Sequence, residues 1–83
     1  MYELIFKTPA ERFLKKFDKE TQKQILNRLK KLKNNPELGK PLVGNLSGLW
    51  SLKFGNYRAI YQIKHQELLI LVLKIGHRKN IYS

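Results

Sequence analysis

The 83-residue sequence predicts a two-layer α+β domain in which two helices pack on one face of a mostly antiparallel sheet. Three observations predict this fold: helix-start signals followed by helical apolar spacing near the N-terminus, a β-hairpin pattern over residues 49–63, and a nearly unbroken apolar run over residues 68–75. A chain of this length forms one domain, residues 1–83, with a thin core. The expected order is β-α-α-β-β-β, with four strands.

The first predicted elements are a short strand and a short helix. Residues 2–7 form the strand candidate. Thr8 is the expected N-cap of the helix, Pro9 suits its first position, and Glu11 completes a capping box. The apolar face of this helix is expected to carry Phe13, Leu14 and Phe17.

A second, longer helix is predicted from an N-cap at Asp18 to about Lys33. Its apolar residues recur at helical spacing: Ile25, Leu29 and Leu32. Asn35-Pro36 ends it, because the residue before a proline disfavours helical backbone. Residues 36–48 are rich in Gly and Pro and are expected to be a long loop, either functional or a plain connection.

The hairpin over residues 49–63 turns at Gly55-Asn56. A two-residue loop places Lys53 directly opposite Arg58, and like charges in that relation destabilise a hairpin. Functional sites are where such local rules tend to be broken, and two adjacent cations on a rigid sheet suit a phosphate. The same pairing groups six residues beneath the helices: Trp50, Leu52, Phe54, Tyr57, Ala59 and Tyr61.

The last predicted strand is the apolar run Leu68–Ile75, which follows a turn at 64–67. Continuous apolar sequence is typical of a central strand that is covered on both faces. The tail, residues 76–83, leaves the end of that strand.

Composition limits the possible partners. The chain has 17 Lys and Arg against 6 Asp and Glu, a net charge of +11, which predicts a polyanionic partner, either nucleic acid or an acidic protein. Two His and no Cys argue against a structural zinc site. The N-terminus lacks a signal-peptide layout and no apolar run approaches a membrane span, so we expect no membrane association and a cytoplasmic location.

Three stretches carry a resemblance to a known family. They are PLVGNLSGLW at 41–50, GNYRAIY at 55–61 and IGHRKNIY at 75–82. Together with the order of elements, they resemble the RelE/ParE superfamily of toxins from type II toxin–antitoxin systems, and the resemblance runs essentially end to end.

The RelE branch consists of ribonucleases that enter the ribosomal A site and cleave mRNA there without a metal or cofactor. The resemblance implies that Lys53, Arg58, Arg78 and Tyr82 are the catalytic residues. Some relatives use a terminal His as acid or base, which adds His77. It also implies an acidic, RelB-like antitoxin as partner beside the ribosome and mRNA, with a monomeric free toxin and a higher-order toxin–antitoxin complex.

The chemistry suits these residue types. Attack by a 2′-hydroxyl places extra negative charge on the phosphate, and the planar forks of Arg58 and Arg78 can bind it. Lys53 is either a second phosphate clamp, which we favour, or a base. Tyr82 either stacks on a nucleotide base or orients the attacking hydroxyl.

One departure from the family pattern keeps two other functions open. Family members usually carry two basic residues on the strand that holds Lys53, and Ser51 occupies the first position here. The alternative is a ParE-like toxin that poisons DNA gyrase and has no nuclease site. A basic RNA-binding module without catalysis is the third possibility, and it leaves the grouped cations unexplained.

Overall fold

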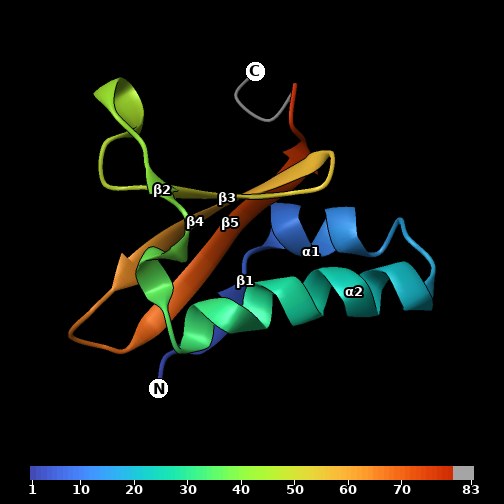
Figure 1. Ribbon diagram of the computed structural model, residues 1–83, viewed down its shortest axis with the longest axis horizontal. Coiled ribbons are helices and arrows are strands. Elements are labelled where there is room, and N and C mark those ends of the chain that lie inside the picture. The colour runs from blue at the N-terminus through green and yellow to red at the C-terminus, as the bar shows by residue number, and fades with distance from the viewer. Residues whose placement is uncertain (80–83) are drawn as a thin grey trace.

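A computed structural model describes residues 1–79 of the chain, with two helices on one face of a five-stranded sheet (Figure 1). The elements are β1 (Glu3–Phe6), α1 (Thr8–Leu14), α2 (Lys19–Lys30), β2 (Lys40–Pro41), β3 (Trp50–Phe54), β4 (Tyr57–Lys64) and β5 (Leu69–His77). Short 3-10 turns lie at Lys31–Lys33, Pro36–Leu38 and Gly44–Leu46. The predicted α+β class and the order of the main elements are therefore confirmed.

The sheet has the strand order β1-β5-β4-β3-β2. Only β1 and β5 run parallel, and every other neighbouring pair within residues 1–79 is antiparallel. The strand β2 adds a fifth member to the four strands expected, because Lys40 and Pro41 pair with Ser51 and Trp50 at the edge of the sheet. Part of residues 36–48, which we expected to form a loop, is thus paired with the sheet.

The two helices begin differently from each other. The side chain of Asp18 accepts a hydrogen bond from the Thr21 N–H, as predicted for the N-cap of α2. The predicted Thr8 cap of α1 is wrong: the helix already includes Thr8, and Lys7 is the capping residue without a side-chain bond. The Lys7 N–H bonds to the Val72 carbonyl, so the chain leaves the parallel ladder directly into the helix.

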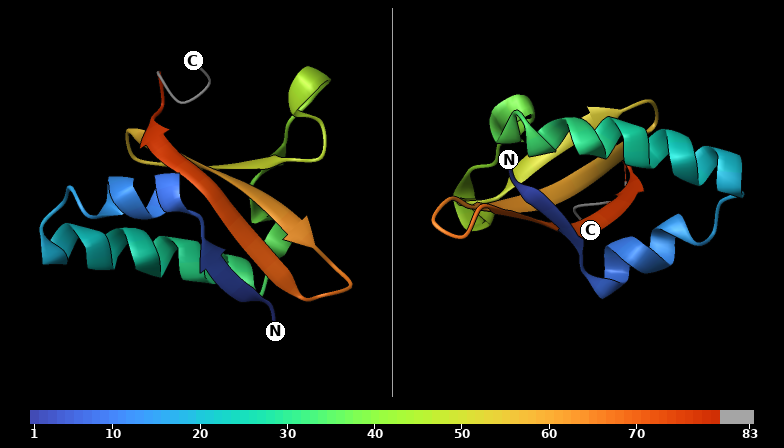
Figure 2. Two further views of the ribbon diagram at one scale, coloured as in Figure 1. Left: turned by 180° about the vertical axis from the view of Figure 1, so that it is seen from behind. Right: turned by 90° about the horizontal axis from the view of Figure 1, so that it is seen from below.

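The core lies between the helices and one face of the sheet. The left-hand view of Figure 2 shows both helices on the same side of the sheet. The predicted pairing holds, with Trp50, Leu52 and Phe54 opposite Tyr61, Ala59 and Tyr57. Ala59 and Tyr61 are fully buried there, beneath Leu29 and Leu32 from the helical layer. These aromatic residues therefore serve the core, as expected.

Strand β5 is central but is covered by helices on one face only. Its core-facing residues Ile70 and Val72 are fully buried, whereas Leu69, Leu71 and Leu73 are half-buried. The expectation of cover on both faces is therefore not met by the helices, and we call the face opposite them the open face (Figure 1). Neither helix in residues 1–79 is long and apolar enough to cross a membrane.

Candidate nucleic-acid interface

The hairpin of β3 and β4 brings two cations together on the open face. Lys53 lies directly opposite Arg58, as the sequence predicted, and Gly55 makes the two-residue turn possible with φ +58°. Arg58 in turn lies opposite Gly76 of β5. We call this line of residues on three adjacent strands, Lys53, Arg58 and Gly76, the second row of the open face.

Arg58 is half-buried and held in place along the sheet. Its Nη1 donates to the Ser51 Oγ at 3.2 Å, and Ser51 is itself only 3% exposed. Its Nε is buried and has no acceptor among the described residues. A buried donor without a partner costs about 1–3 kcal/mol. The guanidinium is thus fixed in direction by Ser51, and its Nε is closed off from solvent without an acceptor.

Lys53 stands beside this guanidinium and is exposed. It lines a hollow of about 280 Å³ together with Arg58 and Ser51, and the lining also includes Gly39 and Lys40 of the edge segment. Lys53 and Arg58 form no ion pair within residues 1–79, where the two ion pairs, Lys15–Glu11 and Lys64–Glu67, lie elsewhere. The cations of this hollow are therefore not neutralised by neighbouring carboxylates of the described chain.

Arg78 follows the end of β5, close to the hairpin turn. Its backbone N–H donates to the Asn56 carbonyl at 2.9 Å, which ties the start of the tail to the turn. Asn56, His77, Arg78 and Lys79 line a further hollow of about 530 Å³. Arg78 lies two residues beyond Gly76 in the chain and directly follows the last residue of β5, so its backbone lies past the second row at the hairpin end of the sheet.

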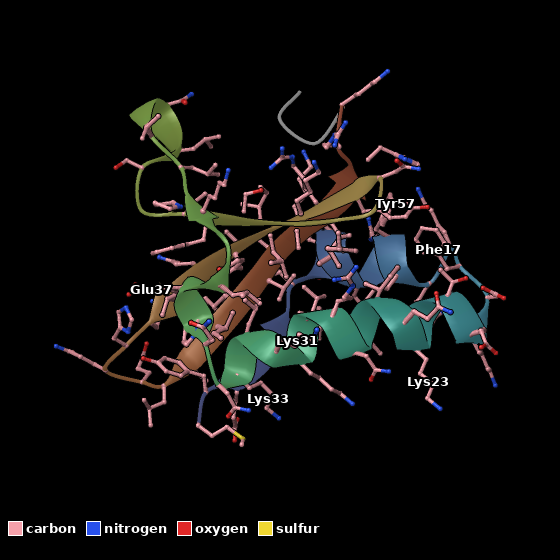
Figure 3. All side chains as sticks on the ribbon, viewed as in Figure 1. Phe17, Lys23, Lys31, Lys33, Glu37 and Tyr57 are labelled. Carbon is pink, nitrogen blue, oxygen red and sulfur yellow. The ribbon has the colours of Figure 1, made fainter. Side chains whose placement is uncertain are left out.

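His77 is not brought to the open face. It pairs with Tyr57, whose ring belongs to the helix side, and the two ring centroids are 5.2 Å apart. Phe13 of α1 approaches the same imidazole at 5.9 Å, and Figure 3 shows Phe17 beside Tyr57 in this cluster. The sheet therefore separates His77 from Lys53 and Arg58. The other predicted site residue, Tyr82, lies outside the described residues.

Two further lysines share the open face and were not singled out from the sequence. They belong to what we call the first row, which crosses four strands through residues that each pair with the next: Lys40, Ser51, Ile60 and Lys74. Lys40 and Lys74 are exposed at its two ends. Alternation along β3 and β4 could have suggested the row, but Lys40 depends on the unpredicted strand β2.

The edge strand β2 is fastened to the sheet through a buried phenol. The Tyr61 hydroxyl donates to the Pro36 carbonyl at 2.7 Å and accepts from the Gly39 N–H at 3.0 Å. Burial raises the pKa of Tyr61, and the Gly39 bond opposes this shift only in part. A Cβ at Gly39 would lie 2.5 Å from the Ser51 carbonyl oxygen, so glycine permits the close approach.

A comparison with protein families matches residues 4–82 to the ParE toxin of the type II toxin–antitoxin system parDE. The chain belongs to this toxin family. It is a toxin of a type II toxin–antitoxin system within the RelE/ParE superfamily, as the sequence motifs indicated.

Individual relatives agree with this assignment. The toxin is 38% identical over 45 residues to the toxin RelG of Mycobacterium tuberculosis, an alignment that covers 54% of this chain but only 52% of RelG. It is 28% identical to a putative RelE-like toxin protein of Escherichia coli, over 94% of this chain and 84% of the relative.

Solved structures share the fold. A chain of the Mycobacterium tuberculosis toxin–antitoxin complex RelBE2 has a TM-score of 0.83 and 30% identity, with 93% of this chain and 98% of that chain covered. The isolated Escherichia coli RelE toxin has a TM-score of 0.75 and 21% identity, with 93% and 84% covered.

Proposed function

We propose that this toxin is a ribosome-dependent endoribonuclease that cleaves mRNA in the A site. The observation that carries the proposal is the pair Lys53 and Arg58, two adjacent cations on a rigid sheet without a carboxylate partner in residues 1–79. The similarity to RelE-like toxins supports the same activity.

In the proposed reaction the 2′-hydroxyl of a nucleotide attacks the adjacent phosphorus. The O2′–P bond forms and the P–O5′ bond breaks, which gives a 2′,3′-cyclic phosphate and a 5′-hydroxyl end. The hydroxyl loses its proton to a base, and the leaving oxygen gains one. By analogy with other oxyanion donors, each fixed cation that contacts the charge developing on the phosphate stabilises the transition state by a few kcal/mol.

We assign the roles by position. Arg58, aimed by Ser51, binds non-bridging phosphate oxygens through its guanidinium. Lys53 clamps the same phosphate from the adjacent strand. Arg78 binds from the hairpin end. The role of Tyr82 rests on the resemblance to the RelE branch alone: it orients the hydroxyl or stacks on a base. We give His77 no part in the reaction, because it packs on the helix side.

The test is primer extension on an mRNA during in vitro translation with purified, antitoxin-free toxin. Discrete cuts at A-site codons, absent with Arg78→Ala, are expected. Intact mRNA with the wild-type toxin would refute the nuclease.

A second candidate is inhibition of DNA gyrase, as for ParE-type toxins. The match to the ParE toxin family and Ser51 in place of a basic residue favour it. A supercoiling assay separates the two functions. Inhibition that survives Arg78→Ala, without RNA cleavage, would identify the gyrase poison.

We further propose an acidic, RelB-like antitoxin as partner. Similar chains occur in toxin–antitoxin complexes named RelBE, and a net charge of +11 favours an acidic protein. The antitoxin covers the Arg58 face or displaces the tail, and the complex is of higher order than the monomeric free toxin. If no small acidic protein encoded beside the toxin restores growth when it is co-expressed, the proposal of an acidic antitoxin is contradicted.

A further inference from the structure

The first row of the open face points to a path for the RNA strand. We propose that Lys40 and Lys74 bind the backbone phosphates on either side of the scissile one, so that the RNA crosses the sheet from β2 to β5. This inference rests on the proposed function, since it extends the site formed by Lys53 and Arg58. The two lysines occupy the ends of a row of directly paired residues.

The dimensions of the row suit a single strand. Lys40 and Lys74 are separated by three inter-strand spacings, about 14 Å between backbones at ~4.8 Å per strand. Each strand of a B-form duplex carries one phosphate per ~3.4 Å along its axis, so at a similar spacing the two ammonium groups can reach phosphates a few nucleotides apart. The second row lies about 7 Å away along the strands, which leaves the scissile phosphate to Lys53 and Arg58.

The middle of the row is neutral. Ser51 and Ile60 are 3% and 7% exposed, and neither side chain carries a charge. A backbone that crosses this row therefore meets a cation at each end and no charge between them in the row itself. Such an arrangement holds a strand by its phosphates and reads no base edge, which suits a binding path with little sequence preference.

Lys40 is exposed on a backbone that is firmly anchored. Gly39 and Pro36 both bond to the buried Tyr61 hydroxyl, and Lys40 pairs with Ser51. Lys40 forms no ion pair within residues 1–79. Its ammonium therefore projects from a fixed edge of the site, and its charge is not cancelled by a carboxylate there.

The test measures binding of a short fluorescent single-stranded RNA, with 2′-O-methyl riboses that block cleavage, by anisotropy across a salt series. Removing one phosphate-binding cation lowers the slope of log K against log salt by about 0.7. We expect this decrease in Lys40→Gln and in Lys74→Gln, and twice the decrease in the double variant, because sites more than ~10 Å apart act independently. Arg at either position should restore the slope.

The matched control is Lys23→Gln, which removes one charge from α2 where Figure 3 shows the side chain pointing away from the sheet. It should leave the slope unchanged. The inference would be overturned if Lys40→Gln, Lys74→Gln and Lys23→Gln all gave the same slope of log K against log salt. It would also be overturned if the wild-type toxin bound no RNA. The binding assay contains no ribosome, so its outcome is independent of the cleavage assay. If the toxin cleaves ribosome-bound mRNA but the three single variants give equal salt slopes, only the proposed RNA path is refuted. If the Lys40 and Lys74 variants lower the salt slope but ribosome-bound mRNA stays uncleaved, the nuclease is refuted and the proposed RNA path is supported.

Discussion

The Nη1 of Arg58 donates a hydrogen bond to the Oγ of Ser51 at 3.2 Å, from one strand of the hairpin to the other. The resemblance to the RelE branch led us to expect a basic residue where Ser51 lies. Here the position is buried and its hydroxyl directs the guanidinium of Arg58 along the open face. Ser51 therefore adds no positive charge to the site, but it positions the charge of Arg58.

Ser51→Ala should lower the rate of mRNA cleavage roughly tenfold, because a hydrogen bond to a charged group is worth about 1.5–3 kcal/mol and the guanidinium would lose its direction. The measurement is single-turnover cleavage of ribosome-bound mRNA. Ser51→Cys keeps a weak acceptor of similar size, so its cleavage rate should lie between those of the wild type and Ser51→Ala. An unchanged rate in Ser51→Ala would show that Ser51 does not position Arg58.

Arg58→Lys should cost about a hundredfold in cleavage rate although it keeps the charge, because lysine lacks the planar fork that binds two phosphate oxygens. Ribosome binding, measured by co-sedimentation, should change little. Arg12→Lys on α1 is the matched control and should cleave like the wild type. Full activity of Arg58→Lys would reduce the role of Arg58 to its net charge.

Tyr61→Phe should destabilise the fold by about 1–3 kcal/mol, because the Gly39 N–H and the Pro36 carbonyl would both lose their partner. Urea denaturation followed by tryptophan fluorescence measures the change in the free energy of unfolding. A variant as stable as the wild type would mean that water replaces the phenol at no cost.

The same residue predicts a pH dependence. Burial raises the pKa of Tyr61 above its ordinary value of 10.0, so the unfolded chain ionises first as the pH rises. This contribution to stability is therefore fully present below pH 10.0 and is lost as the pH rises through the higher pKa of the folded state. Wild type should lose stability above that pH more steeply than Tyr61→Phe. Parallel alkaline limbs would contradict the raised pKa.

Gly39→Ala should also destabilise the fold, by about 1–3 kcal/mol, because its Cβ would meet the Ser51 carbonyl oxygen at 2.5 Å and the Tyr61 hydroxyl at 2.8 Å. Since relief requires β2 to move away from β3, the variant should also lose the contribution of Lys40 to RNA binding. Thermal unfolding and the salt slope measure the two effects. Wild-type values for both would show that β2 is not held by this close approach.

Much of this architecture could be predicted because local signals agree with the fold. The apolar alternation and the Gly55-Asn56 turn determined the hairpin register, and with it the juxtaposition of Lys53 and Arg58. The strand β2 could not be predicted, since two residues including Pro41 give no periodic pattern. Its pairing depends on the buried Tyr61 hydroxyl, a tertiary contact.

The place of His77 and Lys74 depends on a β-bulge. The register between β4 and β5 shifts by one residue between Ile60 and Tyr61. Counted from the turn without this bulge, Ile75 would lie opposite Arg58, and Lys74 would face the helices. A one-residue shift reverses the face of every side chain beyond it. No local pattern in the apolar run revealed the bulge, so the sequence could not show that His77 lies on the helix side of the sheet.

The most direct test of the proposed nuclease is end-group analysis of mRNA cleaved on the ribosome by wild type and by Arg58→Ala. The wild-type toxin should leave a 2′,3′-cyclic phosphate and a 5′-hydroxyl, and a single 2′-deoxy substitution at the cut site should abolish cleavage. Arg58→Ala should leave the mRNA intact. Cleavage that persists with the 2′-deoxy substrate or in Arg58→Ala, or intact mRNA with the wild type, would contradict the account.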